Sequence, residues 1–162
     1  MRSKRTRYLC EAGVIAAAYA ALTVLLAPMS YGPMQVRISE GLCVLPYFTP
    51  AAVPGLFVGC LIANVIGNAL GSSLGLMDIV VGSLTTLAAA WITSKVRVRA
   101  LVPAPAVLCN MFTVPWVLNV MLGVPYWTSA VWVGAGQALA CYGIGLPLLF
   151  ILARSRKAIF QR

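Results

Sequence analysis

Residues 35–40, with the sequence Gln-Val-Arg-Ile-Ser-Glu, carry the side chains best suited to bind a polar ligand. Arg37 and Glu40 stand three positions apart, so they share one face if the segment is helical. The flanking sequence is apolar, and charges at membrane depth usually face each other or a cavity. Two interpretations stay open: a structural ion pair, or a ligand site that also uses Gln35.

Further polar side chains stand singly in apolar sequence, where contact with lipid would be costly. Asp78 could bind a ligand or cap a helix. The amides could bind a ligand or join helices, and Trp116 and Trp127 could stack on a ring or belong to an interfacial belt. Together these groups suit a small, flat, polar heterocycle, because a guanine-like edge offers adjacent N–H donors to a carboxylate. The amides are Asn64, Asn68, Asn110 and Gln137.

Several kinds of chemistry are excluded by what the chain lacks. It contains no histidine, so no Ser-His-Asp or Cys-His arrangement can form. It has no Walker A pattern, so we expect no ATP hydrolysis. Its 5 cysteines form no CxxC pair, which argues against a metal site. We therefore expect no catalytic residues, no metal and no cofactor of its own.

Apolar residues dominate the 162-residue chain: 61% are hydrophobic and only 9% are charged, unlike a soluble domain. Each membrane-spanning helix needs about 20 apolar residues. Proline- and glycine-rich turns divide the sequence into six such stretches. We predict one all-α integral membrane domain, residues 1–162, built as a six-transmembrane-helix bundle with helices at 8–27, 35–49, 54–70, 77–94, 101–122 and 127–153.

Basic residues set the predicted orientation. Of the 12 lysines and arginines, all but Arg37 fall in three clusters, at 2–7, 95–99 and 154–162. Such clusters mark cytoplasmic loops. Six crossings place all three clusters on the side of the N-terminus, whereas five would not, so the short second segment must cross and both termini are predicted to be cytoplasmic. Clustered charge without interleaved aromatic residues argues against nucleic acid as a partner.

The first predicted helix repeats small residues every four positions, which lets another helix approach closely. The neighbour could be a helix of the same bundle or a separate membrane partner. The residues form two sets on adjacent faces: Ala12, Ala16 and Ala20, and Gly13, Ala17 and Ala21.

The string PMSYGPMQVRISE at residues 28–40, followed by Leu42 and Pro46, resembles the QueT family. Its members are substrate-binding S components of energy-coupling factor (ECF) transporters, associated with uptake of queuosine precursors. The similarity also covers residues 55–64, 78–86 and 134–147.

The resemblance implies a six-helix S component of the plasma membrane that binds a 7-deazaguanine: the aminomethyl precursor preQ1, the nitrile preQ0, or queuine. Its partners would be a transmembrane coupling (T) subunit and two ATPase subunits, which alone would use ATP. Gln137 stands where many members carry an acidic residue, which bears on the choice of precursor. The implied site residues are Gln35, Arg37, Glu40, Asn64, Asp78 and Asn110, and the implied docking face is Ala12, Ala16 and Ala20.

Three alternatives stay open from the sequence. The chain could be an S component for another vitamin or small heterocycle. It could be a structural or assembly protein of the membrane without a ligand. It could also be a stand-alone facilitator that needs no ATPase.

Overall fold

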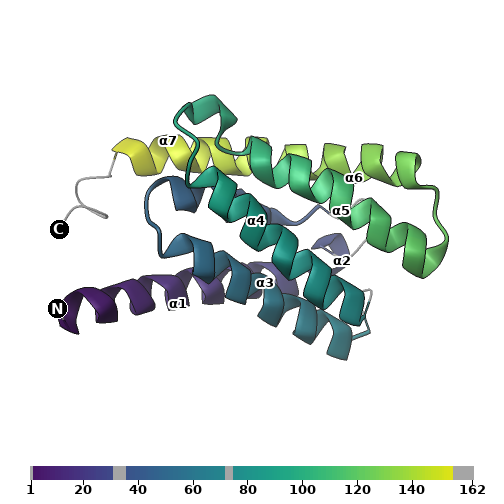
Figure 1. Ribbon diagram of the computed structural model, residues 1–162, viewed down its shortest axis with the longest axis horizontal. Helices are drawn as coiled ribbons and strands as arrows, with labels where there is room; N and C mark the ends of the chain where they lie inside the picture. The colour runs from purple at the N-terminus through teal and green to yellow at the C-terminus, as the bar shows by residue number, and fades with distance from the viewer. Residues whose placement is uncertain (1, 31–35, 72–74, 155–162) are drawn as a thin grey trace.

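The computed structural model describes residues 2–30, 36–71 and 75–154, and every regular element within these ranges is a helix (Figure 1). Two short elements are 3₁₀ helices, η1 and η3, and two are single π-helical turns, η2 and η4, continuous with the α-helices that follow them. In chain order the elements are α1 (Arg2–Leu25), α2 (Ala27–Ser30), η1 (Ile38–Tyr47), α3 (Ala52–Ala69), η2 (Asp78–Gly82), α4 (Ser83–Thr93), η3 (Arg99–Leu101), α5 (Ala104–Leu122), α6 (Tyr126–Ala140), η4 (Cys141–Gly145) and α7 (Leu146–Arg154).

The described helices include 4 stretches long and apolar enough to cross a membrane: Lys4–Leu25, Ala52–Ala69, Arg99–Leu122 and Tyr126–Arg154. A fifth apolar stretch, Asp78–Thr93, is shorter. The predicted helix 35–49 is wrong as a spanning α-helix, because Ile38–Tyr47 form a buried 3₁₀ helix of 10 residues. At about 2 Å per residue it extends only about 20 Å. Pro46 inside it and Gly41 both disfavour a regular α-helix.

α1 and α3 lie side by side and run in the same direction (Figure 1). A Cβ atom built on Gly55 would lie 2.9 Å from the carbonyl oxygen of Ala12, and one built on Gly59 would lie 2.8 Å from that of Ala16. A step of four residues along α3 therefore matches a step of four residues along α1 in the same direction, so the two helices are parallel. The chain must return across the bundle between them, and η1 is part of that return. The crossing of this segment inferred from the basic clusters stays a prediction.

The close contact between α1 and α3 also decides which small residues of α1 face outward. Ala16 and Ala20 are only 6% and 8% exposed, because α3 covers them. Ala16 and Ala20 therefore pack inside the bundle, Ala12 is only partly buried, and docking of a partner at these three residues stays a prediction. The small residues exposed on α1 are Gly13, Ala17, Ala18 and Ala21.

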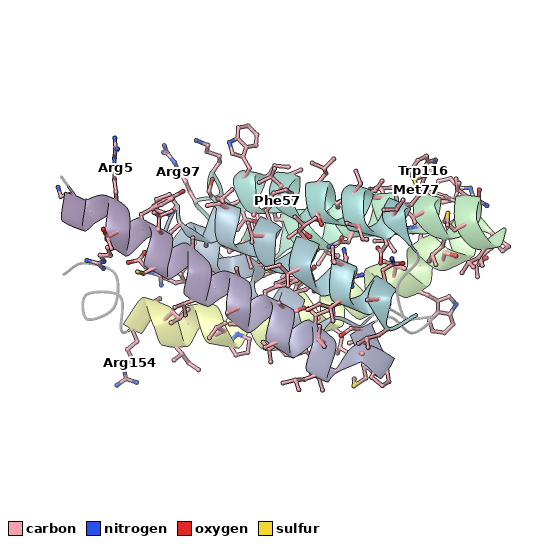
Figure 2. The ribbon with its side chains drawn as sticks, turned by 90° about the horizontal axis from the view of Figure 1, so that it is seen from below. Arg5, Phe57, Met77, Arg97, Trp116 and Arg154 are labelled. Atoms are coloured by element: carbon pink, nitrogen blue, oxygen red, sulfur yellow. The ribbon has the colours of Figure 1, made fainter. Side chains whose placement is uncertain are left out.

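One described arginine from each basic cluster lies at the same end of the molecule. Figure 2 shows Arg5, Arg97 and Arg154 at that end, with Met77 and Trp116 at the other. The start of α1, the connection between α4 and α5, and the end of α7 therefore lie together. The side of the membrane that they face stays a prediction.

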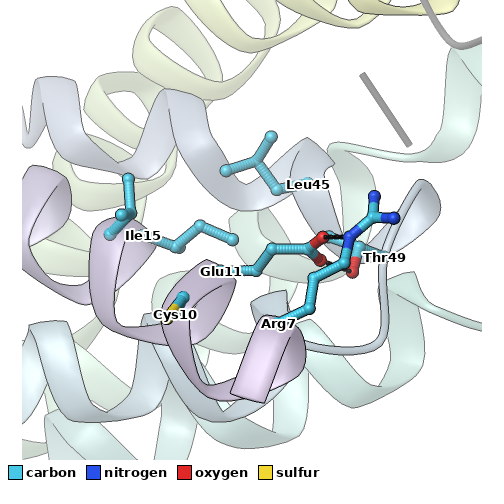
Figure 3. Close-up of a pocket in the computed structure, with 7 residues that line it drawn as sticks. Arg7, Cys10, Glu11, Ile15, Leu45 and Thr49 are labelled. Carbon is cyan, nitrogen blue, oxygen red and sulfur yellow. Dashed lines mark hydrogen bonds and ion pairs between the residues drawn. The ribbon is translucent and has the colours of Figure 1, made fainter. Parts of the chain in front are cut away.

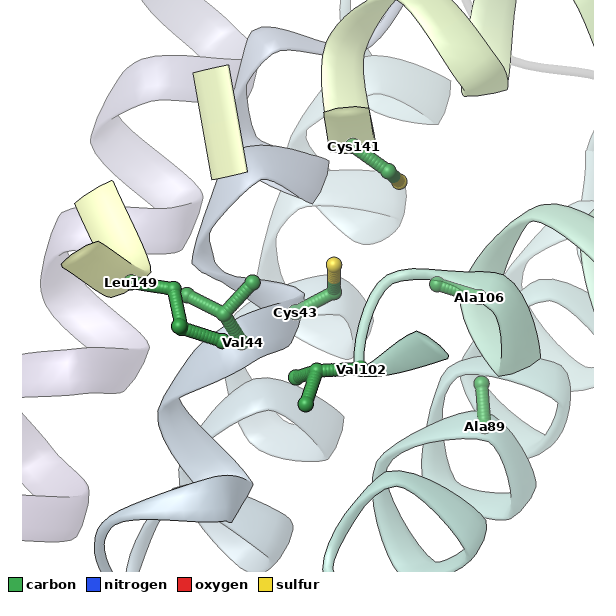
Figure 4. Packing of buried hydrophobic residues seen from close by; sticks show 7 residues of the cluster. All are labelled: Cys43, Val44, Ala89, Val102, Ala106, Cys141 and Leu149. Carbon is green, nitrogen blue, oxygen red and sulfur yellow. The ribbon is translucent and has the colours of Figure 1, made fainter. Parts of the chain in front are cut away.

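η1 is held between helices that are distant from it in sequence. One buried cluster joins it to α4, α5, η4 and α7 (Figure 4). A Cβ atom built on Gly145 would lie 3.0 Å from the carbonyl oxygen of Gly41, so the backbones of η1 and η4 almost touch. The cluster consists of Cys43, Val44, Ala89, Val102, Ala106, Cys141 and Leu149.

Replacing Gly59 with alanine should destabilise the protein, because the new Cβ atom would lie 2.8 Å from both the Ala16 carbonyl oxygen and the Tyr19 Cβ atom. Overpacking of this kind costs about 1–3 kcal/mol. Gly13→Ala is the matched control, since its Cβ atom would meet nothing within 4 Å. Thermal unfolding in detergent compares the two, and equal melting temperatures would contradict the close approach of α1 and α3.

Candidate functional site

A buried ion pair joins the start of η1 to the start of η2. The Arg37 Nη2 and Asp78 Oδ2 atoms are 3.4 Å apart, and the two side chains are 5% and 4% exposed. Arg37 precedes η1 in extended conformation, and its Nε donates to the Ser30 carbonyl oxygen at 3.4 Å. The sequence suggested an ion pair between Arg37 and Glu40 on one α-helical face. The described pair runs to Asp78 instead, because the chain at Arg37 is extended.

Glu40 is held from α1. The Tyr19 hydroxyl donates to Glu40 Oε1 at 2.5 Å, and both side chains are buried. One turn along α1, the Thr23 hydroxyl lies 2.6 Å from that of Ser39 and 2.8 Å from the Tyr19 carbonyl oxygen. The sequence interpretation missed Tyr19, Thr23 and Ser39. The signal for the first two was two polar side chains one turn apart in an otherwise small and apolar helix.

Asn64, on α3, forms a hydrogen bond to the backbone of Asp78. Its Nδ2 donates to the Asp78 carbonyl oxygen at 3.0 Å. Gly82 leaves room for this arrangement, since a Cβ atom there would lie 3.0 Å from Asn64 Nδ2 and 3.2 Å from Asp78 Oδ1. Asp78 and Gly82 begin and end the π-helical turn η2. Such turns occur frequently at functional sites.

η4 contacts the backbone of Glu40 through Cys141. The Cys141 Sγ atom lies 3.6 Å from the Glu40 carbonyl oxygen and 3.7 Å from Gln137 Oε1. Gln137 is 1% exposed. Cys141 begins the second π-helical turn, η4. Helices from both halves of the chain therefore meet at Glu40.

Four buried polar atoms have no hydrogen-bond partner among the described residues. Leaving such an atom unpaired costs about 1–3 kcal/mol, so each one calls for an explanation. A polar ligand that supplies the partners is one such explanation. The atoms belong to α2, α3, α4 and α5 and are Ser30 Oγ, Asn64 Oδ1, Ser83 Oγ and Asn110 Nδ2.

Six of the ligand-site residues predicted from sequence are buried: Arg37, Glu40, Asn64, Asp78, Asn110 and Gln137. Hydrogen bonds and the contacts of Cys141 link all of these but Asn110 within the described part of the chain. Gln35 lies outside the described residues. Asn68 near the end of α3 is exposed, and Trp116 and Trp127 are 47% and 75% exposed, so these three do not line the buried cluster. The exposure of the tryptophans fits the interfacial belt that the sequence left open.

A cavity of about 420 Å³ is found elsewhere, at the N-terminal part of α1 (Figure 3). Its charged groups bond within the chain, since Arg7 Nε and Glu11 Oε1 are 2.8 Å apart and Thr49 donates to Glu11 Oε2 at 3.0 Å. The rest of its lining is mainly apolar, including Val14, Ile15 and Leu45. The bond from Thr49 ties α1 to the connection between η1 and α3. The polar cluster remains the better candidate for ligand binding.

The family model described as QueT transporter matches residues 9–154, which is most of the chain. No curated protein and no solved structure matches the chain.

Asp78→Asn should strongly destabilise the protein, because it removes the carboxylate paired with buried Arg37. Breaking a buried pair from one side costs about 3–5 kcal/mol. Glu11→Gln is the control, since it weakens an exposed pair within α1 worth less than about 1 kcal/mol. Thermal unfolding in detergent measures both. The double replacement Arg37→Met with Asp78→Leu should recover stability. Similar losses of stability in Asp78→Asn and Glu11→Gln would contradict the buried pair.

Proposed function

Because the chain belongs to the QueT transporter family, we propose that it is the substrate-binding S component of an ECF-type importer for a queuosine precursor. The family makes it a transporter rather than an enzyme, and its long apolar helices make it a membrane protein. The observation that carries the proposal is the buried cluster around Arg37, Glu40 and Asp78, with unpaired polar atoms on the helices near it.

The proposed ligand, a 7-deazaguanine, fits the chemistry of these groups. Glu40 accepts the adjacent N–H donors of the guanine edge, and Arg37 donates to the ring carbonyl. Asn64 and Asn110 offer an amide oxygen and an amide nitrogen that are both buried without partners. Asn64 and Asn110 therefore gain hydrogen bonds when the ligand binds, which favours the bound state.

The charge of the cluster favours a cationic precursor. One guanidinium and two carboxylates, from Glu40 and Asp78, formally leave a charge of −1. Gln137 adds no charge. A buried net charge is costly unless it is paired, so the aminomethyl precursor preQ1 binds more tightly than the nitrile preQ0 in this proposal.

Partner subunits supply the ATP hydrolysis that drives transport in this proposal. The S component spans the plasma membrane several times, with both termini in the cytoplasm, and docks on a T subunit that carries two ATPases. ATP is used by those subunits and no cofactor by this one. The docking surface on α1 is the exposed small set Gly13, Ala17 and Ala21, which lets another helix approach closely.

Ligand binding is tested by isothermal titration calorimetry on detergent-solubilised protein, with preQ1, preQ0, queuine and guanine. We expect saturable binding, tightest for preQ1. Glu40→Gln should weaken it at least about tenfold, because a charged acceptor is lost. Glu11→Gln, which lies outside the cluster, should leave it unchanged. Absence of binding to any of the four by folded protein would overturn the precursor assignment.

Docking is tested by co-purification with the T subunit and its ATPases. Ala17→Leu with Ala21→Leu should reduce recovery of the complex, because two larger side chains on an exposed face block close helix contact. Ala18→Leu makes the same change on an adjacent exposed position and should reduce it less. Melting temperatures of all variants should match the wild type. Full recovery of the complex with the double variant would place docking elsewhere.

A further inference from the structure

The packing of α1 against α3 holds Tyr19 in place, independently of its contact with Glu40. Its side chain is 1% exposed, and a Cβ atom on Gly59 would lie 2.8 Å from the Tyr19 Cβ atom. The phenol therefore has little freedom to turn. Its hydroxyl donates to Glu40 Oε1 at 2.5 Å, so a rigid donor sets where one oxygen of this carboxylate lies.

The backbone beside Glu40 is held by the same helix. The Thr23 hydroxyl lies 2.6 Å from the Ser39 hydroxyl, one turn of α1 beyond Tyr19. From η4, Cys141 Sγ lies 3.6 Å from the Glu40 carbonyl oxygen. Both the main chain and the carboxylate of Glu40 are thereby restrained, which is more than burial of a carboxylate requires.

Orientation matters because a carboxylate binds two adjacent N–H donors only when its plane is close to the plane of the donors. The Tyr19 hydroxyl uses one of about four lone-pair positions of the carboxylate and leaves the others for a ligand. A carboxylate free to rotate would still accept one N–H bond from many ligands. Such a carboxylate would lose most of its preference for a ligand with two adjacent N–H donors.

We propose that Tyr19, supported by Thr23 and Ser39, is a positioning residue that orients Glu40 and so selects ligands with two adjacent N–H donors. This inference rests on the proposed function. Tyr19 acts through Glu40 and does not itself touch the ligand. Sites built to bond a particular donor reject analogues without it far more strongly than sites that only fit its shape.

The experiment compares two ligands, preQ1 and its analogue without the 2-amino group, by competition against labelled preQ1. Tyr19→Phe should weaken preQ1 binding at least about fivefold, within the range expected for the loss of one ordinary hydrogen bond to the ligand. The affinity for the analogue should change less than about twofold, because it offers only one donor. Tyr47→Phe is the matched control, a half-buried tyrosine of η1 packed edge-on against Phe48, and should change neither affinity.

Equal losses for both ligands in Tyr19→Phe would overturn the positioning role and leave a structural one. If Tyr19→Phe does not fold in detergent, Ser39→Ala gives the second test, since it releases the backbone at Glu40 and leaves the phenol in place. Unchanged discrimination in that variant would also overturn the proposal. Failure of the wild type to bind preQ1 is a different outcome, because it overturns the proposed function itself.

Discussion

A guanidinium inside an apolar bundle must have a counter-charge, and this requirement organises the polar half of the structure. Arg37 meets Asp78 across 41 positions of sequence, which ties the return segment to the residue after Met77, and Met77 lies at the end of the bundle opposite Arg5, Arg97 and Arg154. Removing charges from water is expensive, and a single pair seldom compensates fully. The additional carboxylate at Glu40 and the unpaired amide atoms nearby raise that cost further, and a bound polar ligand is the explanation that we propose for the cluster.

The apolar half depends on close backbone contact. Gly55 and Gly59 let α3 lie directly on α1, and Gly41 and Gly145 do the same for η1 and η4. Without large side chains between them, four segments fit where side chains of ordinary size would hold them apart. The same contacts bring Tyr19 to Glu40, so packing by glycine is what makes the polar contacts possible.

Sequence reasoning identified Arg37, Glu40 and Asp78 because charges are rare in apolar sequence, and the structure buries all three. It could not pair them, since pairing depends on a fold that brings residue 37 to residue 78. Charge clusters alone predict that the segment 35–49 crosses the membrane, and they carry no signal for the 3₁₀ form that Ile38–Tyr47 adopt. Tyr19 was missed since tyrosine in a membrane helix is unremarkable until its neighbour is known. Trp116 and Trp127 share their sequence pattern with interfacial residues. Only their exposure in the structure separates an interfacial role from stacking on a buried ligand.

The π-helical turn at Cys141–Gly145 has a consequence for the phase of the long helix that contains it. Gln137 and Leu149 are both buried, one beside the polar cluster and the other in the apolar core. In an unbroken α-helix these two positions would point about 120° apart. One extra residue absorbed in the turn reduces the difference to about 20°. A single continuous helix thus keeps one inward side along two environments of opposite character, and a one-residue deletion within the turn would leave a regular α-helix with the same inward side.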